Sequence, residues 1–354
     1  MALKDIVGQE RALEILTGSI TRNRIAHAYL FTGEDGIGKR LTAINFAKSL
    51  NCRNNREASG ANGKRVNNNS SHASRLTPYT IDCCDECPSC IKIDKAIHPD
   101  VFLIAPEAGL ITVSVIRGLE ESLSYKAFEG KWKIVIIDKA DSLNQSAANA
   151  FLKTLEEPPG QSLLVLISSM PELIPQTIRS RCQKINFSPL PIKKMGELLE
   201  YKYSTEGPKI QGQQAKLLGL LSGGRPGWAL GKDLIKKRDR LFDEFKSLLG
   251  GVEEGLWGDR DSMQEWFDWV QLWLRDIAVL KATGRADLLI NQDRVQEMEK
   301  ISKKPGLKDI LNLSNALYDI KNLLRFNLNK QLTLYHTNLL LKKTFGQGPA
   351  VRDL

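Results

Sequence analysis

The chain has 354 residues, more than one ordinary domain needs and enough for two or three. Its 42% hydrophobic content supports packed cores, and no apolar run approaches the roughly 18 residues needed to cross a bilayer, which argues against a membrane-spanning protein. The net charge of +9 favours an acidic partner such as nucleic acid or nucleotide, although solvated surface lysines explain it equally well.

Residues 1–10 contain no apolar core of the signal-peptide type, so we expect a cytoplasmic protein. Thiols stay reduced in the cytoplasm. The six cysteines of the chain are therefore better explained by metal binding than by disulfide bonds.

A glycine-rich loop lies between a short apolar run, residues 27–32, and a stretch with helical spacing, residues 39–50. The loop reads Gly-Glu-Asp-Gly-Ile-Gly-Lys-Arg over residues 33–40, and it matches the phosphate-binding pattern Gly-x-x-x-x-Gly-Lys-Ser/Thr except at the last position. Backbone N–H groups of such a loop, its lysine and the following helix N-terminus surround phosphate oxygens. The sequence predicts a nucleotide-binding loop that uses Gly33, Gly36, Gly38 and Lys39.

Two groups that ATP hydrolysis requires are replaced by cations. Arg40 stands where Ser or Thr would bind Mg²⁺. A buried-strand pattern ends in Asp138, which is suited to metal binding, but Lys139 follows where hydrolysing ATPases of this kind carry glutamate. Loss of a general base alone lowers a rate by about 10²–10⁴-fold. We therefore predict that the chain hydrolyses no ATP and that ATP with Mg²⁺ binds weakly or not at all.

Short apolar runs recur along the first half of the chain and alternate with stretches of helical spacing. The apolar runs are residues 101–104, 134–137, 163–167 and 185–187, and the helical stretches include residues 115–125 and 147–157. This alternation predicts an α/β fold with a parallel sheet covered by helices on both faces. Residues 53–80 are polar and nearly free of large apolar residues, and we interpret them as a flexible insertion.

A cysteine cluster follows this insertion, with two intervening residues between successive members: Cys84, Cys87 and Cys90. A structural zinc site needs four ligands in a tetrahedron. Cys52 is the best fourth ligand, because a long insertion adds little to the entropy of loop closure. Cys83 and His98 remain alternatives. The sequence predicts a structural Zn²⁺ site in a module of about residues 51–97.

After residues 189–191, Pro-Leu-Pro, strand-like runs stop and helical spacing continues to the end. A Gly-Gly-Arg-Pro-Gly break at residues 223–227 predicts a joint within this helical half. Four tryptophans, at positions 257, 266, 269 and 273, lie in the helical stripes that follow. We expect them to form a core or a face that packs against another subunit.

Several motifs occur in a fixed order, and together they resemble the clamp-loader branch of the AAA+ ATPases. They are Ile-Val-Gly-Gln-Glu at 6–10, the phosphate loop, the cysteine cluster, Asn-Ala-Phe-Leu-Lys-Thr-Leu-Glu-Glu-Pro-Pro at 149–159 and Ser-Arg-Cys at 180–182. The resemblance covers roughly residues 1–230. It implies a RecA-like AAA+ domain with the zinc module at residues 1–189, a helical lid at 190–232 and a helical collar at 233–354 that serves oligomerisation.

The resemblance also implies a function. The chain would be a subunit of the DNA polymerase III holoenzyme without polymerase or ATPase activity of its own, because Arg40 and Lys139 depart from the motor subunits, gamma and tau. It would pack beside those motors and the delta subunit, and help to load the sliding clamp on primer–template DNA. Arg181 would reach the ATP site of a neighbouring motor. Arg225 receives no role, because the following Pro-Gly changes its spacing.

Two other functions fit parts of the sequence. One is an active gamma/tau-like ATPase that works through unusual residues at positions 40 and 139. The other is a zinc-dependent DNA-binding protein that retains a relic nucleotide fold. Turnover of ATP by the purified chain distinguishes the first, and salt-dependent DNA binding by the isolated chain distinguishes the second.

Overall fold

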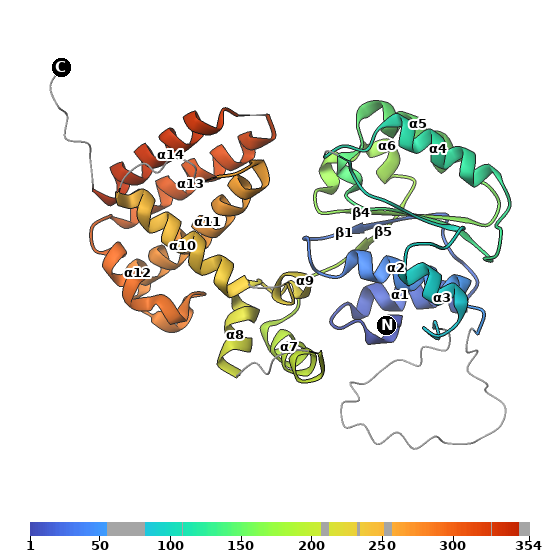
Figure 1. Ribbon diagram of the computed structural model, residues 1–354, viewed down its shortest axis with the longest axis horizontal. Coiled ribbons are helices and arrows are strands. Elements are labelled where there is room, and N and C mark those ends of the chain that lie inside the picture. Colours follow the sequence, from blue (N-terminus) through green and yellow to red (C-terminus); the bar gives the residue numbers. More distant parts are fainter. Residues whose placement is uncertain are drawn as a thin grey trace. The chain divides into compact units, whose positions relative to one another are not determined.

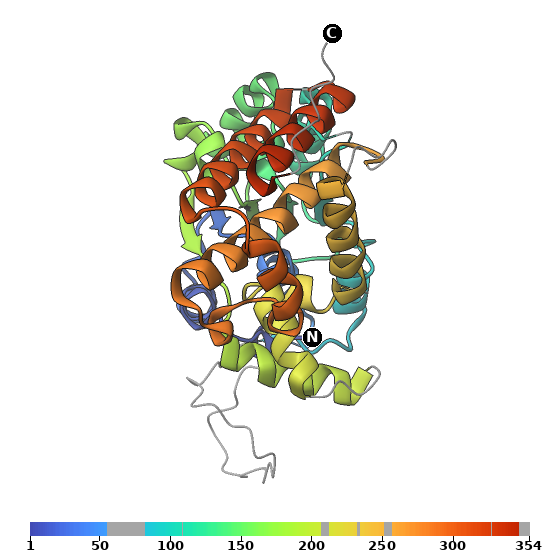
Figure 2. The same ribbon diagram turned by 90° about the vertical axis from the view of Figure 1, so that its left-hand side faces the viewer.

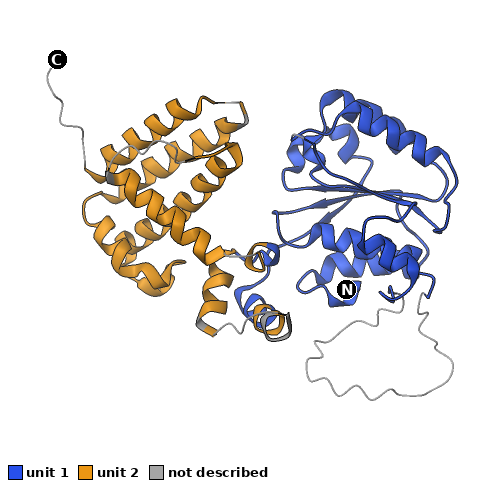
Figure 3. Cartoon of the chain, in the orientation of Figure 1, with its two compact units in different colours: residues 1–198, 223–227 blue, residues 199–222, 228–354 orange. Residues whose placement is uncertain are grey.

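The computed structural model describes residues 1–54, 82–107, 109–206, 212–231, 234–250, 257–326 and 328–346. The chain forms two compact units, one of residues 1–198 with 223–227 and one of residues 199–222 with 228–354 (Figure 3). Nearly all of the insertion predicted at 53–80 lies outside the described residues. The division into three domains, with a separate lid at 190–232, stays a prediction.

The first unit is built on a five-stranded parallel sheet with the strand order β2-β3-β4-β1-β5. Its strands are β1 (Ala28–Thr32), β2 (Val101–Ile104), β3 (Lys133–Ile137), β4 (Ser162–Ser168) and β5 (Gln183–Asn186). β1 pairs with both β4 and β5, so the strand that leads into the phosphate loop lies inside the sheet. The predicted parallel α/β sheet is confirmed.

Helices cover both faces of this sheet (Figure 1). One face carries α1 (Glu10–Thr21) and α2 (Lys39–Asn51), and the other carries α4 (Val113–Ser124), α5 (Gln145–Glu156) and α6 (Gln176–Arg179). Side chains alternate along a strand, so Phe31 of β1 belongs to the core that contains Phe46 of α2, while its neighbour Leu30 belongs to the core that contains Phe151 of α5. Two apolar cores therefore hold β1, the strand that leads into the phosphate loop, from both faces.

The remaining elements are short in the first unit and helical in the second. The first unit also contains η1 (Leu3–Asp5), α3 (Pro88–Asp94), η2 (Ala140–Ser142) and η3 (Pro171–Leu173), and α7 (Ile192–Glu206) begins in it. The helices that follow are α8 (Gly212–Leu221), α9 (Pro226–Ala229), α10 (Leu234–Gly250), α11 (Arg260–Thr283), η4 (Ala286–Leu288), η5 (Gln292–Arg294), α12 (Val295–Ser302), α13 (Leu307–Leu323), η6 (Leu324–Phe326) and α14 (Lys330–Phe345). None of the described helices is long and apolar enough to cross a membrane.

In the second unit, α10, α11, α13 and α14 pack side by side (Figures 1 and 2). Trp266 and Trp273 of α11 are fully buried, and the ring centroid of Trp273 lies 5.0 Å from that of Phe242 of α10. Trp257 and Trp269 are buried as well. The tryptophans predicted to form a core or a packing face therefore form the core, and the helical C-terminal region is confirmed.

The packing of α5 generates a stability prediction. Phe151 is fully buried against the sheet, so Phe151→Ala should lower the free energy of unfolding by about 3–5 kcal/mol, through lost burial and the cavity left behind. Urea unfolding of the purified chain measures this change. The exposed Lys153 on the same helix provides the control, since Lys153→Ala should change the free energy by about 0.5 kcal/mol or less. Equal effects of the two substitutions would contradict the placement of α5.

Candidate functional site

The phosphate loop connects β1 to α2 in a conformation that depends on its glycines. Gly33 has φ +136°, and a Cβ atom there would lie 2.5 Å from the carbonyl oxygen of Phe187. Gly38 is the N-cap of α2 and lies in the left-handed region at φ +101°. Gly36 also has a positive φ. The predicted loop therefore forms at the N-terminus of a long helix, which is the arrangement that attracts phosphate.

The loop lysine points back into the loop. Lys39 is 5% exposed, and its Nζ donates to the carbonyl oxygens of Gly33 and Glu34, the latter at 2.7 Å. Asp35 lies 3.6 Å from the same nitrogen. Burial lowers the pKa of Lys39, and the nearby carboxylate of Asp35 opposes that shift. The ammonium group is thus held inside the loop, where an anion would meet it.

The two substituted positions both contact Asp138, Arg40 through its side chain and Lys139 through its backbone. Nη1 of Arg40 is 3.5 Å from Oδ2 of Asp138, which directly follows β3. Lys139 takes the left-handed region at φ +50°, and its backbone N–H donates to Oδ1 of Asp138 at 3.1 Å. The structure therefore brings the guanidinium of Arg40 to the one carboxylate expected to bind a metal, whereas the side chain of Lys139 is exposed.

The contact between residues 223–227 and the phosphate loop was not predicted from the sequence. The backbone N–H of Gly227 donates to the carbonyl oxygen of Gly36 at 2.8 Å, and Nη1 of Arg225 lies 3.7 Å from Oε2 of Glu34. A Cβ atom at Gly227 would lie 3.1 Å from the backbone of Gly36. The glycines of the Gly-Gly-Arg-Pro-Gly break at 223–227 could have indicated this contact, because glycine allows one backbone to approach another closely. The break belongs to the same compact unit as the phosphate loop.

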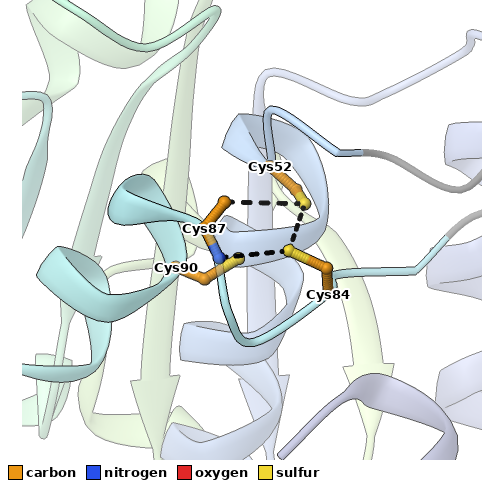
Figure 4. A group of neighbouring side chains, drawn as sticks. All are labelled: Cys52, Cys84, Cys87 and Cys90. Atoms are coloured by element: carbon orange, nitrogen blue, oxygen red, sulfur yellow. Dashed lines mark hydrogen bonds between the residues drawn. The ribbon is translucent and has the colours of Figure 1, made fainter.

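The four cysteines predicted to bind metal come together beside α2 and α3 (Figure 4). The sulfur atoms of Cys52, Cys84, Cys87 and Cys90 all lie within 4.8 Å of one another. The sulfur of Cys52 is 3.5 Å from that of Cys84 and 3.9 Å from that of Cys87. Four thiolates at about 2.3 Å from a tetrahedral metal are about 3.8 Å apart. The residues therefore fit a four-thiolate metal site.

The two alternative fourth ligands are engaged elsewhere. The sulfur of Cys83 lies 3.5 Å from Oδ1 of Asp85, and burial raises the pKa of the Cys83 thiol to about 12. Both ring nitrogens of His98 have partners, the hydroxyl of Ser89 at 3.1 Å and the backbone N–H of Asp100 at 3.1 Å. The geometry thus selects Cys52 from the alternatives.

A buried lysine attaches the cysteine module to the helix that follows the phosphate loop. Lys48 of α2 has no exposed side-chain surface, and its Nζ donates to Asp85 and, at 2.9 Å, to Asp94. Burial would lower the pKa of Lys48, but its hydrogen bonds to Asp85 and Asp94 outweigh burial and raise it. The metal site and the phosphate loop are therefore built on opposite ends of one helix.

Arg181 lies on the surface of the first unit, in the turn between α6 and β5. Its side chain is 37% exposed. Nη1 donates to the carbonyl oxygen of Thr177 at 2.9 Å, and Nη2 donates to Oε1 of Glu156 at 2.6 Å. The predicted reach of Arg181 into a neighbouring subunit stays a prediction.

The family of the chain follows from a comparison with known proteins. A family model described as "DNA polymerase III, delta subunit" matches residues 8–191, just over half of the chain. The chain belongs to this family. A second model, "DNA polymerase III, delta subunit, C terminal", matches residues 255–343 in the helical unit.

Curated relatives agree with the family models. The chain is 28% identical to DNA polymerase III subunit delta' of Bacillus subtilis, over 95% of this chain and 96% of that one. It is 28% identical to subunit delta' of Pseudomonas aeruginosa, over 94% and 96%. With subunit tau of Escherichia coli it shares 32% identity over 57% of this chain but only 28% of tau. The predicted clamp-loader subunit is confirmed, and the two relatives above that match over nearly their full length are of the delta-prime type, which the departures at Arg40 and Lys139 also favour.

Solved structures align more loosely. A DNA polymerase III gamma subunit-related protein of Thermotoga maritima aligns at 18% identity and a TM-score of 0.41, over 96% of this chain and 100% of that one. A RuvB variant of the same organism aligns at 14% identity and a TM-score of 0.45, over 96% and 89%. Because both TM-scores lie below 0.5, the fold assignment rests on the sheet order and the family models instead.

The cysteine geometry predicts the metal content of the protein. Purified chain should carry about one metal ion, and Cys84→Ser should remove most of it, because a tetrahedral site needs all four ligands. Elemental analysis measures the content. The matched control is Cys83→Ser, since Cys83 is the adjacent buried cysteine outside the cluster. Equal metal loss from both variants would contradict this ligand set.

Proposed function

We propose that the chain is a non-hydrolysing delta-prime subunit of the bacterial DNA polymerase III clamp loader. It packs beside ATPase motor subunits and supplies Arg181 to the ATP site of a neighbour. The observation that carries the first part is the ion pair between Arg40 and Asp138, 3.5 Å apart. The match over almost the full length of two delta-prime relatives supports the proposal that this subunit is of the delta-prime type.

The ion pair acts against metal binding in two ways. The half-exposed guanidinium of Arg40 lies 3.5 Å from the carboxylate of Asp138, the ligand that a Mg²⁺ ion would use, and arginine does not lose its charge in proteins. A divalent cation about 4 Å from such a charge is repelled by several kcal/mol at an effective dielectric near 20. Phosphoryl transfer requires the metal to bridge the outer phosphates. The cradle of Gly33, Gly38 and Lys39 remains, so nucleotide binding without metal is compatible with the site while hydrolysis is not.

Calorimetry of the purified chain with ATP tests this proposal. We expect weak binding that Mg²⁺ does not strengthen, and no steady release of phosphate. In the double variant Arg40→Thr, Lys139→Glu, the repulsion is removed, so Mg²⁺ should tighten ATP binding by at least about tenfold. Strong Mg²⁺-dependent binding and steady turnover by the unmodified chain would instead favour an active gamma/tau-like ATPase.

Arg181 is proposed to act on the ATP of a neighbouring motor subunit. Its planar guanidinium suits phosphate oxygens, and its partly exposed position in the turn before β5 leaves it within reach of another chain. An arginine supplied in trans to a nucleoside triphosphate raises the rate of its hydrolysis by about 10³–10⁵-fold. A subunit that lacks hydrolysis can therefore still control hydrolysis next to it.

Arg181→Ala should leave the fold intact, because the side chain lies on the surface, and should depress the DNA-stimulated ATPase of the reconstituted loader. At the one site that receives this arginine the loss should approach about 10³-fold or more. Steady-state ATPase assays with primer–template DNA measure it. Arg179→Ala, which removes an exposed arginine two residues away, serves as the control and should have no effect. Full ATPase activity of the loader with the Arg181→Ala subunit would contradict this role.

The cysteine cluster is proposed to hold Zn²⁺ in a structural role. Four thiolates leave no open position for substrate, which is typical of structural rather than catalytic zinc. Bound zinc would join the residue after α2 to the turn that begins α3, and Lys48 already links the same two elements. The site would stabilise the module without any part in phosphoryl transfer.

The proposed partners are the gamma or tau motors and the delta subunit, with the sliding clamp and primer–template DNA in the assembled loader. Helix α14 carries exposed Leu332, Tyr335 and Leu339 at helical spacing, which gives it an apolar outer stripe. An exposed apolar stripe of this kind is typical of a surface that packs against another protein. The net charge of +9 is compatible with DNA as a further partner.

A further inference from the structure

The side chain of Arg181 is held in one direction by two acceptors from different elements. Oε1 of Glu156, the last residue of α5, lies 2.6 Å from Nη2. The carbonyl oxygen of Thr177 in α6 lies 2.9 Å from Nη1. A guanidinium has five N–H donors in a rigid fork, so each terminal nitrogen keeps a second hydrogen. The contacts restrain the arginine without consuming its capacity to bind phosphate.

Glu156 is itself anchored to the core of the first unit. The preceding residues Thr154 and Leu155 are buried, and Thr154 donates to Oε1 of Glu120 on α4 at 3.0 Å. Pro158 and Pro159 follow, and proline cannot continue a helix, so α5 ends where the carboxylate projects. The position of Glu156 is thus set by the packing of α5 on the sheet rather than by a loose surface loop.

The location of this carboxylate is electrostatically unfavourable in isolation. A negative charge at the C-terminal end of a helix opposes the helix dipole. The guanidinium of Arg181 compensates it directly, at 2.6 Å. Arg181 has a corresponding anchor, because Ile178 of α6, three residues before it, is fully buried. Both partners therefore project from fixed backbone, and they meet at the surface.

We propose that Glu156 is a positioning residue for Arg181, and this inference rests on the proposed role of Arg181 in trans. Glu156 holds the long arginine side chain in the one orientation from which its remaining N–H groups reach the triphosphate of the adjacent subunit. Without Glu156, the side chain samples several rotamers and must be ordered during each catalytic cycle. Ordering a rotamer-rich side chain reduces a rate or affinity by about two- to tenfold.

The test is a set of subunit variants in the reconstituted loader, assayed for ATP turnover in the presence of primer–template DNA. Glu156→Ala should lower kcat about two- to tenfold with little change in the KM for ATP, because the arginine acts on the transition state. Glu156→Gln should restore most of the rate, because its amide oxygen can still accept from Nη2. Glu157→Ala, which removes the exposed carboxylate next along the chain, should have no effect.

A double variant separates positioning from a general structural effect. In the Arg181→Ala background, Glu156→Ala should cause no further loss, because it acts only through the arginine. If Arg181→Ala itself leaves turnover unchanged, the proposed role in trans fails. If Arg181→Ala lowers turnover but Glu156→Ala leaves it unchanged, raises it, or lowers it by the same factor in both backgrounds, positioning by Glu156 is overturned while the role of Arg181 stands.

Discussion

The contact between Arg40 and Asp138 is the constraint on which the functional interpretation depends. Two residues far apart in the chain meet because β1 and β3 lie in one parallel sheet, with their carboxyl ends at the same edge. At that edge a nucleotide motor would place a metal ion. Here a guanidinium stands against the carboxylate, so the charge that the metal would supply is already built into the chain. The phosphate cradle keeps its glycine conformations, because Gly33 packs closely against the backbone of Phe187 and Gly38 lies in the left-handed region.

The same unit keeps a second arginine at its surface, and in the proposed mechanism that arginine serves a neighbour. Both arginines are partly exposed and paired within the unit, Arg40 with Asp138 beside the phosphate loop and Arg181 with Glu156 near the turn before β5. The difference is one of location rather than of chemistry. In the proposed mechanism, a subunit that hydrolyses no ATP supplies an arginine to the hydrolysis carried out by its neighbour.

Much of this arrangement was predictable from local patterns. The short apolar run before the phosphate loop forms β1, which is buried at each of its five positions because a central strand of a parallel sheet is covered on both faces. The cysteines at 84, 87 and 90 signalled a metal module by spacing alone. The sequence favoured Cys52 as the fourth ligand, but it left Cys83 and His98 as alternatives because the chain between Cys52 and the cluster is long. Only the packing of α2 beside α3 places Cys52 at the cluster and turns Cys83 towards Asp85.

Residues close together in the chain determined the alternation of strands and helices and the phosphate loop, since periodicity and loop geometry are local properties. The same is true of the two replaced residues, Arg40 and Lys139. The tertiary structure alone decided which distant groups meet: Arg40 with Asp138, Gly227 with Gly36, and Arg181 with Glu156. Such pairs depend on how the strands are ordered in the sheet and on which face each helix covers. Those choices are set by burial summed over two whole cores, and no short stretch of sequence contains that information.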